Sequence, residues 1–503
     1  MTGYKNTAEA MAELRRREAD VKALYHAMGV LEYDGETVAP RDSADGRART
    51  MGYLSGLLYA QTTDPALFEL VDWLDARKTE LGFEEAREVK LVKKQCDEIS
   101  KIPAEEYVAY SELVSRANAV WHDAKVNSDF ASFAPYLEKI VAFNIRQAGW
   151  LHPEMETYNA LLDSYEEGLT TDTLDRFFGM LRTGLVPVIE AVGKKAQPDC
   201  AFLNQIYPVG AQREMSLSIM RLMGLNMDRI ILGEVEHPFT TGFNLCDERI
   251  TTHFHEDDMM SNLFSVLHEG GHAIYDMGSE PRYDYTVLCG GSAMSIHESQ
   301  SRFYENIIGR SRAFAGPLLR LCRQYFPAQL EGVTEDAFWK AANKAQPSLI
   351  RTEADELTYC MHVMVRYEIE RALVCGDLKV KDVPGVWNEL YKKYLGVVPS
   401  CDREGCLQDS HWAGGSLGYF PSYALGSAYG AQFLSVMEKD VPQLWEKVAE
   451  GDLSPVTGWL HDKIHRHGSL YTPAELMNDI CGGFNAQYFI NYLTNKYTEL
   501  YQL

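Results

Sequence analysis

Apolar residues recur at the spacing of an α-helix along most of this chain. The segments with this periodicity are rich in Ala, Leu and Glu, and turn signals separate them. The pattern predicts helices over residues 7–28, 48–61, 84–101, 104–126, 131–148 and 171–194, and the same texture returns from residue 305 to the C-terminus. We therefore expect a mainly α fold.

The domain organisation follows from the continuity of this texture. A length of 503 residues would by itself allow roughly three domains. However, the sequence has no fixed-period repeat, no low-complexity tract and no Pro/Gly-rich linker. One large helical domain over residues 1–503 is the more economical prediction, with the motifs of interest between residues 237 and 426.

The helical texture is interrupted at residues 229–254. Residues 229–232 and 247–254 are β-branched or alternate between apolar and polar side chains, which is typical of strands. Asp247, Arg249 and Thr251 would share one face of the second strand. We predict a small antiparallel β-sheet here, with that face turned toward a bound peptide backbone.

An amphipathic helix is predicted directly after this sheet. Asp257 and Asp258 mark its start, where negative charge is favoured, and Gly278 marks its end. His268 and His272 lie one turn apart on one face. A separate, buried stripe is formed by Leu263, Leu267, Gly270, Ile274 and Met277.

His268 and His272 frame the sequence His-Glu-Gly-Gly-His. Two imidazoles at this spacing can reach a single Zn²⁺, which lowers the pKa of a water ligand to about 7. Glu269 is rotated by about 100° from His268, so it is placed to take a proton from that water rather than to bind the metal. Asp276, one turn past His272, could orient that imidazole. The alternative is a core helix with two hydrogen-bonded histidines.

A catalytic zinc site needs a third protein ligand and keeps a fourth position open. We favour Glu298, because residues 292–305 resemble the start of a second helix, and 26 residues after His272 suffice for a turn back. The alternative role of Glu298 is an i,i+4 ion pair with Arg302. The carboxylates considered for this ligand are Glu280, Asp284, Glu298 and Glu305.

Composition narrows the class of protein. The 48 basic and 72 acidic residues give a formal charge of −24, which argues against nucleic acid or an anionic membrane as a partner. We find no apolar run long enough to span a membrane and no signal-peptide core in residues 1–20. The ten cysteines are scattered without a Cys-x-x-Cys pair, as expected for reduced thiols in a cytoplasmic protein.

Several short motifs occur in the order found in one known family. The chain resembles the thermostable carboxypeptidase (Taq carboxypeptidase) family of zinc metallocarboxypeptidases. The resemblance extends toward both ends, through residues 31–37, 158–162 and 464–472. The core motifs are His-Pro-Phe (237–239), Asp-x-Arg-x-Thr (247–251), the metal motif (268–272), His-Glu-Ser-Gln (297–300), Ile-Arg-Thr-Glu-Ala-Asp (350–355), 405–412 and 419–426.

The resemblance implies His268, His272 and Glu298 as metal ligands and Glu269 as the catalytic carboxylate. It also implies a saddle-like helical molecule with a deep groove, usually a homodimer, that removes C-terminal residues with broad side-chain tolerance. Tyr33 stands where many relatives have Trp, and residues 38–40 replace a Met-containing turn. Both departures are far in sequence from the metal motif.

A carboxypeptidase needs a cation for the free carboxylate of its substrate, and the planar guanidinium of arginine suits this. Arg249 and Arg351 both lie in the family motifs. We prefer Arg351 for the terminal carboxylate and give Arg249 a supporting role. The alternative for each is a structural ion pair, Arg249 with Asp247 and Arg351 with Asp355.

The carbonyl oxygen of a scissile bond gains negative charge during hydrolysis, and a hydrogen-bond donor near it would help. His411, Tyr423 and Tyr419 are candidates from their motifs, with packing in the groove wall as the alternative. We expect His411 and Tyr423 to take part in catalysis and Tyr419 to bind substrate. His237 could bind the substrate backbone, and His297 could brace Glu298 or approach the substrate.

Three functions fit these residues. The first is a metallocarboxypeptidase acting on peptides with a free C-terminus. The second is a zinc oligopeptidase or peptidyl-dipeptidase of the same fold type. The third is a helical scaffold with a structural zinc, which is disfavoured because structural sites commonly use cysteine and fill all four positions. Zn²⁺ is the expected cofactor, one per chain, although Co²⁺ suits the same ligands.

Overall fold

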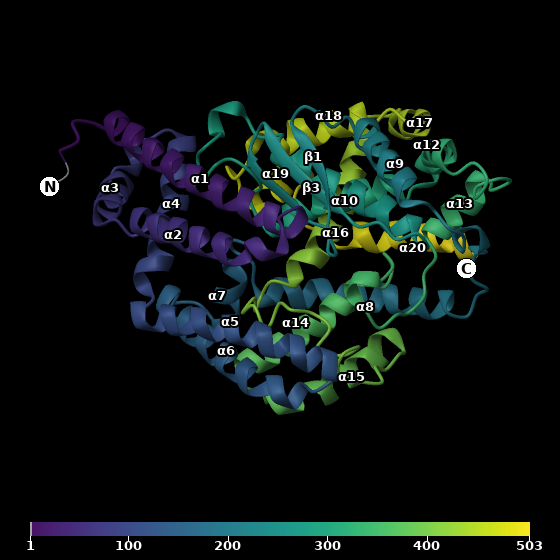
Figure 1. The fold of residues 1–503 in the computed structure, drawn as a ribbon, viewed down its shortest axis with the longest axis horizontal. Coiled ribbons are helices and arrows are strands. Elements are labelled where there is room, and N and C mark those ends of the chain that lie inside the picture. Colours follow the sequence, from purple (N-terminus) through teal and green to yellow (C-terminus); the bar gives the residue numbers. More distant parts are fainter. Residues whose placement is uncertain (1–2) are drawn as a thin grey trace.

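The computed structural model describes residues 3–503 and is mainly helical, as predicted (Figure 1). Its N-terminal helices lie together at one end of the long axis (Figure 1). They have a small apolar core of their own, which includes Leu14, Leu70 and Val92. These helices are α1 (Thr7–Thr37), α2 (Ala44–Thr62), α3 (Pro65–Asp75) and α4 (Phe83–Lys101).

The remaining helices share one large core that runs from Ala117 to Tyr501. One group lies along the lower side of Figure 1: α5 (Ala104–Asn127), α6 (Phe130–Leu151), α7 (Thr157–Asp163), α8 (Thr171–Val192), α14 (Tyr359–Cys375) and α15 (Val383–Leu395). The others are α9 (Val209–Leu222), α10 (Met259–Asp276), α11 (Met294–Arg302), α12 (Arg312–Tyr325), α13 (Glu335–Ala342), α16 (Pro421–Asp440), α17 (Leu444–Glu450), α18 (Ser454–Lys463), α19 (Pro473–Cys481) and α20 (Gln487–Tyr501).

The predicted helix boundaries agree with the structure to within a few residues, with one clear difference. The first helix continues to Thr37 instead of ending at residue 28. Gly29 does not break it, because the missing side chain makes room for Phe243, whose ring would lie 2.7 Å from a Cβ at this position. The extension carries Tyr33 across the sheet. Helices α3, α7 and α9 were not predicted.

The sheet is mixed, so the prediction of an antiparallel sheet is wrong in part. Its strands are β1 (Ile230–Glu234), β2 (Thr240–Asn244) and β3 (Asp247–Thr252), in the order β1-β3-β2. β2 pairs antiparallel with β3, whereas β1 pairs parallel with it. The chain reverses after β1 and again after β2, and β3 then inserts between them, so β1 and β3 run in the same direction.

The expected exposed face of β3 is only partly present. Asp247 and Arg249 are half-buried, but Thr251 is fully buried, and its hydroxyl donates to the Phe239 carbonyl at 2.9 Å. Because β3 is the central strand, both of its backbone edges are already paired. Asp247 and Arg249 thus remain accessible on this face, Thr251 does not, and β3 offers a peptide no free backbone edge.

Helix α11 packs between α10 and α16, and glycines allow the close approach. A Cβ on Gly271 would lie 2.8 Å from the Cα of Ser301, and a Cβ on Gly426 would lie 2.8 Å from the Cβ of Glu298. The first turn of α11 is capped from a distance by Glu166, which accepts hydrogen bonds from the Ser295 N–H and hydroxyl, both at 2.6 Å. These contacts fix the position of α11 against α10.

Within residues 3–503, the helices are too short or too polar to cross a lipid bilayer.

Candidate metal centre

Helices α10 and α11 bring His268, His272 and Glu298 together. One ligand atom from each lies within 4.8 Å of the others. The Nε2 atoms of His268 and His272 lie 3.7 Å and 3.6 Å from Oε2 of Glu298. Helix α10 begins at an N-cap, Asp258, which accepts from the Ser261 N–H at 3.0 Å and so matches the start expected from the sequence. The three donors converge on one point between the two helices.

The second ring nitrogen of each histidine is also held. Nδ1 of His268 lies 2.9 Å from Oε2 of Glu305. Nδ1 of His272 lies 2.5 Å from Nδ1 of His297, whose Nε2 lies 2.9 Å from Oδ1 of Asp276. Partners of this kind fix the orientation of metal-binding imidazoles and leave Nε2 directed at the metal.

Two sequence expectations are corrected by these contacts. Asp276 contacts His297 and not His272, because the His297 ring is inserted between them. Glu305, one of the candidate third ligands, lies behind the His268 ring. His297 therefore braces the ligand His272, and not Glu298 as the sequence suggested.

Glu298 serves two partners at once. Its Oε1 accepts from the Arg302 guanidinium at 2.7 Å, while Oε2 faces the two imidazoles. The ion pair with Arg302, considered above as an alternative to metal binding, therefore coexists with the cluster. Two imidazole nitrogens and one carboxylate oxygen are the donor set of a catalytic zinc site, so these residues fit a divalent ion.

The two histidines differ in their electrostatics. Burial lowers the pKa of His268, but the carboxylates of Glu298 and Glu305 outweigh it and the net shift is upward. Burial and the neighbouring His297 hold the pKa of His272 well below its usual value. His272 is thus the neutral imidazole that metal binding requires.

Glu269 lies on the side of α10 that faces β2. Its Oε2 accepts a hydrogen bond of 2.6 Å from the Thr240 hydroxyl, and burial raises the pKa of the carboxyl. A general base in a dry site benefits from such a shift, although a bound cation would lower the pKa again. Thr240 was missed by the sequence analysis, because its proximity to Glu269 depends on how β2 packs on α10.

Arg351 pairs with a different carboxylate from the one proposed. Its Nε and one terminal nitrogen donate to Oδ1 of Asp409 at 3.1 and 2.9 Å, whereas Asp355 caps the following turn by accepting from the N–H of Thr358. Arg366 binds the other oxygen of Asp409 at 2.6 Å. Burial would raise the pKa of Asp409, but the two guanidinium groups hold it far below its usual value. Two cations thus share the Asp409 carboxylate, and the carboxyl of Glu370, one turn from Arg366 on α14, lies within electrostatic range of Arg366.

The residues suggested for the oxyanion lie beside this pair of arginines. Nε2 of His411 lies 3.2 Å from the Tyr423 hydroxyl, and the Tyr419 ring packs edge-on against Tyr423 at 5.2 Å between centroids. The Arg351 guanidinium lies 4.9 Å from the centre of the Tyr423 ring. Burial, with a further contribution from Arg351, lowers the pKa of His411 to about 4. His411 is therefore neutral near pH 7.

Tyr359 connects this group with the metal cluster. The Arg302 guanidinium lies 4.4 Å from the centre of its ring, and Arg351 donates to its hydroxyl at 3.0 Å. Tyr359 was not predicted, since no motif spacing marks a residue that joins two arginines from different parts of the chain. It sets the metal cluster and the Arg351 group side by side.

Arg249 and His237 lie on the sheet side of the molecule. Arg249 forms a two-pronged ion pair with Asp247, at 2.7 and 3.0 Å, and its guanidinium lies about 5 Å from the rings of both Tyr33 and Phe243. The ion pair considered as the alternative is thus present. His237 is exposed in the loop between β1 and β2.

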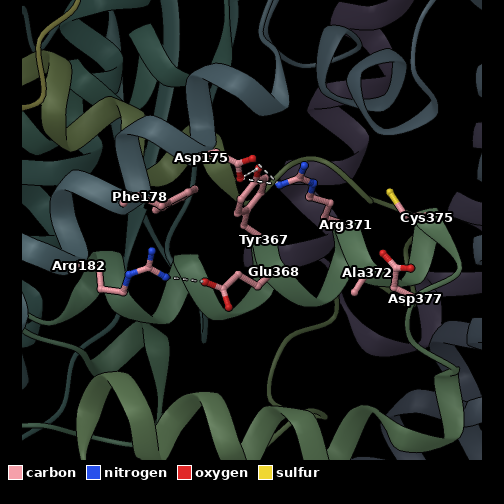
Figure 2. A pocket seen from close by; sticks show the side chains of 10 residues that line it. Asp175, Phe178, Arg182, Tyr367, Glu368, Arg371, Ala372, Cys375 and Asp377 are labelled. Carbon is pink, nitrogen blue, oxygen red and sulfur yellow. Dashed lines mark hydrogen bonds and ion pairs between the residues drawn. The ribbon is translucent and has the colours of Figure 1, made fainter.

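A cavity of about 390 Å³ lies between α8 and α14, apart from these residues (Figure 2). Four of its charged groups are paired with one another: Arg371 binds Asp175 at 2.6 Å, and Arg182 approaches Glu368 at 3.7 Å (Figure 2). The predicted site residues are not among its lining residues.

A His-His-Glu cluster with an adjacent glutamate on a helical scaffold is typical of metallopeptidases, and it places this protein in that class. The sequence model of the family described as "Carboxypeptidase Taq (M32) metallopeptidase" matches residues 13–497. Carboxypeptidase 1 of Bacillus subtilis (strain 168) is 40% identical over 479 residues, which cover 95% of this chain and 96% of that protein. Thermostable carboxypeptidase 1 of Pyrococcus furiosus is 35% identical over 494 residues, 97% of this chain and 98% of that one.

The crystal structure of an M32 carboxypeptidase from Deinococcus radiodurans R1 has a TM-score of 0.95 at 35% identity, with 98% of this chain and 100% of that chain covered. The chain therefore belongs to the M32 family of metallopeptidases, the Taq carboxypeptidases. Its activity is that of a metal-dependent carboxypeptidase.

Proposed function

We propose that this protein releases single amino acids from the C-terminus of peptides, with broad side-chain tolerance, and that it holds one Zn²⁺ per chain through His268, His272 and Glu298. The convergence of these three donors within 4.8 Å is the observation that supports the proposal most directly. Co²⁺ suits the same donors. The braced Nδ1 atoms of both histidines favour a fixed site in which Nε2 is the ligand atom.

The chemistry divides between the ion and the protein. A divalent ion bound here would act as a Lewis acid that acidifies water and polarises the scissile carbonyl. Glu269 takes up the proton of the attacking water at its carboxylate and passes it to the leaving amine. The hydroxyl of Thr240 holds one oxygen of Glu269, so that the carboxylate keeps a fixed orientation.

Substrate binding is assigned to the second group of residues. Arg351 would bind the terminal carboxylate, supported by its position beside Tyr423 and by the sharing of its anion, Asp409, with a second cation, Arg366. His411 and Tyr423 would donate toward the carbonyl oxygen as it gains negative charge; one such donor contributes about 3 kcal/mol. Tyr419 and His237 would contact the substrate, and Arg249 would support it from the sheet side.

Product analysis tests this function. A peptide with a free C-terminus and the same peptide with an amidated C-terminus are incubated with the protein, before and after treatment with a chelator, and the products are identified by mass spectrometry. We expect a ladder of single-residue losses from the free acid alone, abolished by the chelator and restored by Zn²⁺. Internal cleavage of the amidated peptide, or release of dipeptides, would instead support the oligopeptidase alternative.

We propose a homodimer in the cytoplasm, with residues 1–503 as one domain and with peptides, not nucleic acid or membranes, as partners. The formal charge of −24 and the scattered free cysteines support the compartment and the choice of partners. Sedimentation analysis would test the oligomeric state directly.

A further inference from the structure

The segment that carries His411 is held from behind by helix α14. We call residues 408–418 the His411 loop. Arg366 and Glu370 lie one turn apart on α14, and both are 0% exposed. Each contacts a different end of the loop, so that His411 lies between two attachment points.

The Arg366 attachment holds the start of the loop. Arg366 donates to Oδ2 of Asp409 at 2.6 Å and to Oε1 of Gln408 at 2.7 Å. Gln408 in turn donates to the carbonyls of Leu349 and Glu404, both at 3.0 Å. The start of the loop is therefore fixed by the ion pair between Arg366 and Asp409 and by the hydrogen bonds of the Gln408 amide.

The Glu370 attachment holds the other end. Oε1 of Glu370 accepts from the Trp412 indole N–H at 2.7 Å, and Oε2 accepts from the Gly418 N–H at 2.8 Å. A third donor, the Tyr158 hydroxyl on α7, reaches Oε2 at 2.8 Å. Trp412 directly follows His411, and Gly418 directly precedes Tyr419.

The backbone at this end has little freedom to compensate for a lost attachment. Gly418 has a φ of +92°, which disfavours any residue with a Cβ, and a Cβ there would lie 3.0 Å from the Leu161 carbonyl carbon. The Tyr419 ring packs edge-on against Tyr165 at 5.2 Å. A shift at Gly418 would thus move Tyr419 away from Tyr423.

Glu370 is a buried carboxylate that accepts three hydrogen bonds and does not touch the metal cluster. Because burying a charge is costly, its presence here indicates a specific role. We propose that Glu370 is a positioning residue for peptide hydrolysis: by holding Trp412 and Gly418 it fixes His411 and Tyr419 for the reaction. This inference rests on the proposed roles of His411 and Tyr419.

The protonation state of Glu370 decides how many donors it can satisfy. The polar groups that face it are Arg366 on its own helix, Tyr158 on α7, Tyr165 after α7, and the loop donors Trp412 and Gly418. Burial raises the pKa of Glu370 to about 7, against the lowering effect of these hydrogen bonds. Below pH 7 the added proton occupies one acceptor position, so one attachment weakens.

The Glu370→Gln variant tests the proposal, because a neutral amide has the shape of the protonated carboxyl. We would measure kcat and KM on a free-acid peptide from pH 5.5 to 8.5 for the wild type and the variant, with metal content and melting temperature measured in parallel. The ratio of wild-type to variant kcat should be about tenfold at pH 8.5, as for one lost hydrogen bond, and should approach one at pH 5.5. Metal content should stay unchanged, whereas KM should rise as Tyr419, the proposed substrate contact, is displaced.

Two matched variants separate positioning from general stability. Trp412→Phe removes a loop donor and should lower kcat as Glu370→Gln does, whereas Tyr158→Phe removes the donor on the α7 side and should change kcat less than twofold. A kcat ratio for Glu370→Gln that does not vary with pH, or equal losses in the two matched variants, would overturn the proposal. Wild-type kcat in His411→Asn would contradict the proposed role of His411; wild-type behaviour of Glu370→Gln beside an impaired His411→Asn would contradict the role of Glu370 alone.

Discussion

Replacing Gly426 with alanine should weaken metal binding from outside the cluster. The added Cβ would lie 2.8 Å from the Cβ of Glu298, 3.0 Å from its Cγ and 3.0 Å from the Ser295 carbonyl oxygen. Neither helix can yield easily, because α11 is packed between α10 and α16 and is capped by buried Glu166. Overpacking of this kind costs about 1–3 kcal/mol. If the strain is relieved by displacing Glu298, the affinity for the metal falls by roughly 5- to 150-fold.

The measurement is a competition titration of the purified variant with a zinc chelator, together with its melting temperature. The matched control is Gly458→Ala on α18, which is exposed and has no atoms within 4 Å of the added Cβ. This control should retain wild-type affinity and gain about 0.5–1 kcal/mol in stability from helix propensity. Wild-type zinc affinity in Gly426→Ala would refute the claim that this contact sets the position of Glu298.

Three further predictions concern single side chains. Arg351→Met should raise KM for free-acid peptides while zinc content is unchanged, because Arg366 still neutralises Asp409; unaltered peptide kinetics would remove Arg351 from the binding site. Glu269→Gln should bind zinc normally but lose most of its kcat, and full turnover would show that another group takes the proton. His411 has a pKa lowered to about 4 when folded, so its contribution to stability is present above pH 6.5 and is lost as the pH falls toward 4. In urea titrations without metal, the wild type should therefore lose about 2.5 kcal/mol more than His411→Gln between pH 7.5 and 4.5, and parallel losses would argue against a neutral buried His411.

The parts of the site that could be predicted from the sequence are those encoded over short distances. His268 and His272 share a helix face because of the α-helical period, and the buried stripe and the cap at Asp258 mark that helix independently. The choice of Glu298 needed only a turn and a second helix. The family motifs extended this prediction to Arg351, His411 and Tyr423, which the structure places in one group.

The partners of these residues could not be predicted, because they come from distant parts of the chain. Glu166 caps α11 from 129 residues away, and Asp409 binds Arg351 from 58 residues away. Local spacing pointed to Asp355 as the partner of Arg351, and to His272 as the partner of Asp276. In both cases the packing of the chain brings another side chain into the position of the expected partner: Asp409 in place of Asp355, and His297 in place of His272. The parallel pairing of β1 was missed for the same reason, since strand order depends on which strand inserts in the middle.

The assignment of His268, His272 and Glu298 as zinc ligands can be examined by diffraction from crystals of the zinc-loaded protein, recorded at the zinc absorption edge. We expect one strong anomalous peak per chain, about 2.0–2.1 Å from Nε2 of both His268 and His272 and within bonding distance of Glu298, with one coordination position free of protein atoms. A peak away from these three residues would contradict the assignment. So would a peak at which Glu298 binds only Arg302, or at which a fourth protein side chain completes the coordination.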